Sequence, residues 1–64
     1  MGYKKYSNYS AAEEMVSYIK RGGITSRNTA YRELLTISKE WPGTDAAYEA
    51  EYLINSEYAD QKYN

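Results

Sequence analysis

Residues 10–23 read SAAEEMVSYIKRGG and carry the clearest structural signal in the chain. Ser10, followed three residues later by Glu13, matches the capping box that begins an α-helix. Apolar side chains then recur at the spacing of one buried helix face, at Ala12, Met15, Val16 and Ile19. The glycine pair that follows supplies a left-handed stop. This stretch therefore predicts a helix over 11–21.

Two further helices are predicted after the glycine pair. Thr25 or Ser26 caps the first of them, over 26–41, which ends next to the single proline because proline disfavours helical geometry in the residue before it. Thr44 caps the last helix, over 45–58. Their buried faces consist of Ala30, Leu34, Ile37 and Trp41, then Ala46, Ala47, Ala50, Leu53 and Ile54. Short loops place neighbouring helices antiparallel, so we expect an all-α, three-helix bundle.

The two ends of the chain lie outside this predicted bundle. A chain of 64 residues holds one domain at most, which we place at 10–58. Residues 1–9 form a polar N-terminal arm, and residues 59–64 form a frayed C-terminal tail. Tyrosine occupies every third position of the arm, at Tyr3, Tyr6 and Tyr9. A chain this short buries only about 60% of its unfolded surface, so we favour an arm whose rings fold back over a thin core.

The composition excludes several kinds of catalysis. The chain contains no cysteine and no histidine. Zinc sites built from these residues, thiol catalysis and histidine acid–base catalysis are therefore excluded. The closest carboxylates, at positions 13 and 14 and at positions 49 and 51, have spacings that do not place both on one helix face. We therefore expect that the protein is not an enzyme and that it uses no metal and no cofactor.

Charge is distributed unevenly along the chain. Residues 1–43 hold seven Lys and Arg against four Glu, whereas residues 44–64 hold one Lys against five Asp and Glu. This asymmetry can steer a partner but does not identify one. The longest apolar runs are a few residues, far short of the roughly 20 that a membrane-spanning helix needs. We expect a cytoplasmic protein without a membrane segment, and the lack of cysteine suits a reducing compartment.

Part of the sequence resembles a known helical repeat. The spacing of the second helix of a tetratricopeptide repeat, with its closing proline, is reproduced by Ala30, Leu34, Ile37 and Pro42. The next segment, PGTDAAYEAEYLI at 42–54, is similar to the entry of a following repeat, most of all to repeats of bacterial envelope assembly proteins. The resemblance covers residues 30–54 and not the whole chain. It implies a helical scaffold that binds protein segments, and it assigns packing positions rather than functional residues.

Basic residues gather around the first turn and the start of the second predicted helix, at Lys20, Arg21, Arg27 and Arg32. In a helix-turn-helix protein, the start of the second helix contacts base edges. The arm also interleaves aromatic rings with Lys4 and Lys5, as single-strand binders do. The net charge of −1 is unlike the basic bias of most DNA-binding domains. A small nucleic-acid-binding regulator that uses Arg27, Arg32 and the arm is therefore the second hypothesis.

The leading hypothesis is a non-catalytic protein-interaction module. The chain has nine Tyr, one Trp and no Phe, and tyrosine packs its ring while keeping its hydroxyl in water. Tyr and Arg are also enriched at interface hot spots. We expect a stand-alone inhibitor or adaptor, of the kind that phages and mobile elements make, which occludes a partner's surface; a homodimer is also possible. The candidate contact residues are Tyr3, Tyr6, Tyr9, Arg27, Arg32, Tyr48, Tyr52 and Tyr58.

Overall fold

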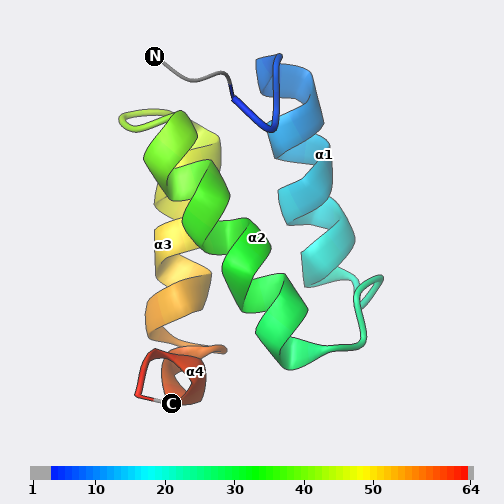
Figure 1. Cartoon of the computed structure of the whole chain (residues 1–64), viewed down its shortest axis with the longest axis vertical. Helices are drawn as coiled ribbons and strands as arrows, with labels where there is room; N and C mark the ends of the chain where they lie inside the picture. Colours follow the sequence, from blue (N-terminus) through cyan, green and yellow to red (C-terminus); the bar gives the residue numbers. More distant parts are fainter. Residues whose placement is uncertain (1–3, 64) are drawn as a thin grey trace.

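The computed structural model describes residues 4–63 as an all-helical globule with no strand in that part of the chain. Three main helices are followed by a short fourth: α1 (Tyr9–Lys20), α2 (Arg27–Glu40), α3 (Asp45–Asn55) and α4 (Ala59–Lys62). In Figure 1, α2 lies in front, with α1 to one side of it and α3 behind, and α4 follows α3 at the far end from the arm. The predicted all-α fold of three main helices is confirmed. Within residues 4–63, no helix combines the length and the apolar character needed to cross a membrane.

The first helix begins earlier than the sequence predicts. Asn8, not Ser10, is its N-cap, because the side chain of Asn8 accepts a hydrogen bond from the Ala11 amide at 2.9 Å. The predicted capping box at Ser10 is therefore wrong. Both residue types are good caps, and the earlier start is the one in which the ring of Tyr9 packs against Trp41.

The caps of the next two helices match prediction. The Ser26 hydroxyl accepts from the Thr29 amide at 3.2 Å at the start of α2. The Thr44 hydroxyl accepts from the Ala47 amide at 3.3 Å at the start of α3. Each bond satisfies one of the amides that a helix leaves without an internal partner, and losing such a cap costs about 1 kcal/mol.

The C-terminal part differs from the predicted long third helix and frayed tail. Helix α3 ends at Asn55, and the Tyr58 amide donates back to the Leu53 carbonyl at 2.9 Å. This reversal carries the ring of Tyr58 into the core and leads into α4, so a helical turn stands where the sequence predicts fraying over 59–64. No glycine or proline marks the reversal, and residue 64 lies outside the described residues.

The core lies where the three main helices meet. The largest fully buried side chains are Leu34, Ile37 and Val16, and burying each contributes roughly 1.5–3 kcal/mol. The predicted inner faces are buried, except that Met15 and Trp41 are only partly covered. The arm and the end of the chain each add one buried ring, from Tyr6 and Tyr58.

Two glycines make the turn between α1 and α2. Gly22 has a φ of +83°, a backbone conformation that disfavours other residues, and its amide donates to the Ile19 carbonyl at 3.0 Å. Gly23 is constrained by space instead, because a Cβ there would lie 2.4 Å from the ring of Tyr18. The predicted glycine stop is therefore confirmed by the positive φ of Gly22, whereas a side chain at Gly23 would require the exposed ring of Tyr18 to move.

Candidate functional site

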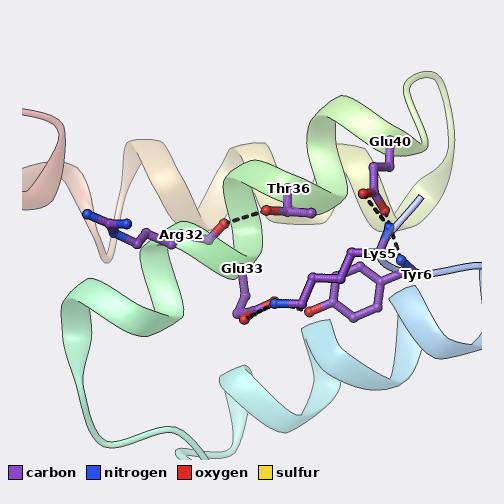
Figure 2. Close-up of polar contacts among 6 residues, drawn as sticks. All are labelled: Lys5, Tyr6, Arg32, Glu33, Thr36 and Glu40. Atoms are coloured by element: carbon purple, nitrogen blue, oxygen red, sulfur yellow. Dashed lines mark hydrogen bonds and ion pairs between the residues drawn. The ribbon is translucent and has the colours of Figure 1, made fainter. Parts of the chain in front are cut away.

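The N-terminal arm is bound to the C-terminal half of α2. The Glu40 carboxylate accepts hydrogen bonds from two successive amides, those of Lys5 at 2.7 Å and Tyr6 at 3.0 Å (Figure 2). The indole Nε1 of Trp41 donates to the Tyr6 carbonyl at 3.0 Å. These three bonds hold the arm backbone against α2, so the described part of the arm has a defined path.

Glu33 binds the side chains of both Lys5 and Tyr6. Its carboxylate lies 2.6 Å from the Lys5 ammonium and accepts a hydrogen bond from the Tyr6 hydroxyl (Figure 2). Burial raises the pKa of Glu33, but the hydrogen bonds from Lys5 and Tyr6 outweigh it, so the pKa lies below its ordinary value. Burial, and then the hydrogen bond to Glu33, raise the pKa of Tyr6 well above its ordinary value.

The other described aromatic group of the arm region also serves the fold. The rings of Tyr9 and Trp41 pack edge to face at 5.7 Å, and the Tyr9 hydroxyl accepts from the Ala46 amide at 3.0 Å. The Lys4 ammonium lies 3.8 Å from the centre of the Trp41 ring. Tyr6 and Tyr9 therefore cover the core, as the favoured interpretation of the arm predicts, whereas Tyr3 lies outside the described residues.

Tyr58 and Arg27, two of the predicted partner-contact residues, contact each other and other residues of the chain. Tyr58 is only 7% exposed, and the Arg27 guanidinium lies 4.8 Å from the centre of its ring. Arg27 also donates to Asp60 at 2.5 Å and to the Glu57 carbonyl at 2.6 Å. The hydrogen bond from Arg27 is the main reason that the pKa of Asp60 lies below its ordinary value. This ion pair joins the start of α2 to α4.

The remaining basic residues predicted near the first turn do not form one patch. Lys20 pairs with Glu49 at 2.8 Å, and Arg21 lies 5.3 Å from the centre of the Tyr18 ring. Arg32 is exposed and donates to Asn28 at 3.1 Å. Arg21 lines the same hollow as Glu49, the partner of Lys20, whereas Arg32 lines a different one, so the predicted cluster is divided.

The exposed face of α3 is the clearest candidate for a partner contact. Tyr48 and Tyr52 are 63% and 69% exposed, and their spacing of four places them one turn apart on the helix. They line a shallow hollow together with Asp45 and Glu49. This face combines aromatic rings with carboxylates.

A second hollow adjoins this face between α1 and α3. Asp45 and Glu49 line both hollows, and Glu13 and Glu14 of α1 line the second. Carboxylates therefore continue from the α3 face onto α1, although Arg21 also lines this second hollow. Lys20, paired with Glu49, offsets part of this charge.

Sequence reasoning missed the groups that hold the arm. Glu33 and Glu40 are seven residues apart, a spacing that places both on one face of a helix. That spacing was the available signal, but no local pattern connects them to residues more than 25 positions earlier in the chain. Asp60 was missed because the tail was predicted to be frayed.

Comparisons with protein-family models, with curated proteins and with solved structures found no match to this chain. The resemblance of residues 30–54 to a tetratricopeptide-type hairpin stays a prediction.

Proposed function

We propose that this chain is a non-catalytic protein-interaction module that binds a partner protein through the exposed face of α3. The observation that carries the proposal is the pair Tyr48 and Tyr52, two large rings one helical turn apart that other described residues leave mostly uncovered. Tyrosine is enriched at interface hot spots because its ring contributes contact area and its hydroxyl a hydrogen bond.

The opposite face of α3 supports this role. Ala46, Ala47, Ala50, Leu53 and Ile54 are all buried, so the helix is anchored along its length. A helix held in this way presents its outer side chains in one arrangement before binding. Preorganisation of this kind reduces the ordering cost that a flexible segment pays on association.

A carboxylate beside the rings favours a partner surface that carries Lys or Arg. Asp45 lines the same hollow as the two tyrosines and forms no ion pair with another described residue, whereas Glu49 in that hollow is paired with Lys20. A partner's guanidinium can pair with a carboxylate and also stack on a ring. The contact between the cation and the ring contributes about 0.5–2 kcal/mol. Charge of this kind mainly increases the association rate and the specificity.

A protein is favoured over a nucleic acid as the partner. Arg27 and Lys5, two residues of the nucleic-acid hypothesis, are paired with Asp60 and Glu33 inside the chain. Duplex binding depends on Lys and Arg side chains that are available to phosphates.

A chain that works by covering a partner's surface fits a stand-alone inhibitor or adaptor. Its lack of cysteine fits the cytoplasm.

The test is affinity capture from a lysate of the source organism, with identification of the captured protein and calorimetry on the purified pair. We expect Y48A/Y52A to lose the protein that the wild type captures. The matched control is Tyr63→Ala, which removes an exposed tyrosine outside α3. Equal capture and equal affinity for the wild type and Y48A/Y52A would refute the proposal.

A further inference from the structure

Most cationic side chains of this chain already have an anionic or aromatic neighbour. Lys5, Lys20 and Arg27 form ion pairs. The other engaged cations, each beside an aromatic ring, are Lys4, Arg21 and Lys62. Arg32 and Lys39 have neither kind of neighbour within residues 4–63, and together they complete the eight Lys and Arg of the sequence.

These two uncompensated cations line one hollow between α2 and α4. Arg32 extends away from the Lys5–Glu33 pair, as Figure 2 shows, and its Nε donates to Asn28 at 3.1 Å. The half-buried Tyr31 and Leu35 also line this hollow and pack against the core, so apolar surface lies beside the cations.

The spacing of the cations defines what would fit them. Seven residues at about 1.5 Å each place Arg32 and Lys39 roughly 10 Å apart along α2, two helical turns. A helix with acidic side chains seven positions apart has the same separation. An apolar side chain between those two carboxylates would lie over Tyr31 and Leu35.

We propose that this hollow is a docking site for an acidic, amphipathic segment of a partner protein. The proposal does not depend on the α3 face, because the two hollows share no lining residue. Two cations that have no anionic or aromatic neighbour among residues 4–63 suit a few carboxylates better than a nucleic-acid backbone, which typical binders contact at more phosphates. A site here would give the chain a second binding surface, as an adaptor requires.

The test is selection of a displayed library of random peptides on the wild-type protein. We expect the enriched peptides to be rich in Asp and Glu with apolar residues between them. Their affinity should fall about tenfold in R32A/K39A, because two charge-assisted contacts are lost. It should also weaken as salt rises.

The matched control is K20A/K62A, which removes the same charge from exposed cations that do not line this hollow. Peptide affinity should be retained there and in Y48A/Y52A, so a failure of the α3 proposal would leave this result unchanged. Circular dichroism melting should give the same Tm for R32A/K39A and the wild type, since both side chains are exposed.

Three results would overturn the proposal. The first is a selection with no enrichment, without an acidic bias, or with peptides that bind R32A/K39A equally well. The second is binding of single-stranded or duplex oligonucleotides that R32A/K39A abolishes, which would identify a nucleic-acid site. The third is a dimer by light scattering that R32A/K39A converts to a monomer, which would identify a second copy as the occupant.

Discussion

The hydroxyl of Tyr6 donates a hydrogen bond to the carboxylate of Glu33, 27 residues later in the chain. Tyr6 is buried at 7% exposure, and Glu33 also holds the Lys5 ammonium. The bond therefore closes a long loop and attaches the arm to α2. Because α2 packs against both α1 and α3, this bond attaches the arm to the helix that contacts the other two main helices.

Replacing Tyr6 with Phe tests the contribution of that bond. The ring would stay in the core while Glu33 loses a donor in a place where water has limited access. We expect the free energy of unfolding to fall by about 1–2 kcal/mol, measured by urea denaturation. The control Tyr63→Phe removes an exposed hydroxyl and should change the free energy of unfolding by less than about 0.5 kcal/mol. Equal effects of the two changes would contradict this role.

Acid should weaken the same contact. The pKa of Glu33 in the folded chain lies below its ordinary value of 4.5, so the folded state favours the charged form. Its contribution to stability is present above pH 4.5 and is lost as the pH falls through the lower folded value. Glu33→Gln should therefore be less stable than the wild type at pH 7, and the difference should narrow in acid. Urea denaturation at several pH values measures this difference in unfolding free energy. A difference that stays constant with pH would show that the charge of Glu33 does not contribute.

Alkali acts on the other partner with the opposite sign. The pKa of Tyr6 is raised above its ordinary value of 10.0, so the folded state favours the neutral phenol. The stabilisation is complete below pH 10 and is lost as the pH rises above it. The wild type should lose stability more steeply than Tyr6→Phe above pH 10. Denaturation curves that run parallel for the two proteins there would contradict the assignment.

The sequence predicted the interior of the helices better than their ends. The inner face of α3 follows from apolar spacing, which depends only on neighbours along one helix. The arm was harder, because its path depends on Glu33, Glu40 and Trp41, which lie far away in sequence. Long-range polar contacts of this kind leave no periodic signal.

The candidate surfaces show the same limit. Tyr48 and Tyr52 could be placed beside the buried face of a helix from their spacing alone, and they are exposed. Tyr58 was predicted at the surface on the assumption that the third helix continues, but the reversal after Asn55 turns it inward. Lys39 was not singled out, because only the structure shows which cations lack a partner among the described residues.

A side chain at Gly23 should cost a modest amount of stability because of Tyr18. A Cβ at Gly23 would lie 2.4 Å from the ring, so the ring has to move. We expect Gly23→Ala to cost about 1 kcal/mol of unfolding free energy, near the low end for overpacking because Tyr18 is partly exposed. Adding Tyr18→Ala should abolish most of that cost in a double-mutant cycle. Purely additive changes would mean that the backbone of the turn, not the ring, excludes alanine.

The tyrosines of α3 should matter for binding and not for folding. Tyr48 and Tyr52 leave most of their surface in water, so little buried area is lost when they are shortened. Y48A/Y52A should therefore unfold within about 0.5 kcal/mol of the wild type. By contrast, Tyr58→Ala removes a buried ring and should cost roughly 3–5 kcal/mol. Thermal and urea denaturation of the three proteins measures both differences. A large loss of stability in Y48A/Y52A would mean that these rings support the fold, and loss of partner capture by that variant would then no longer identify an interface.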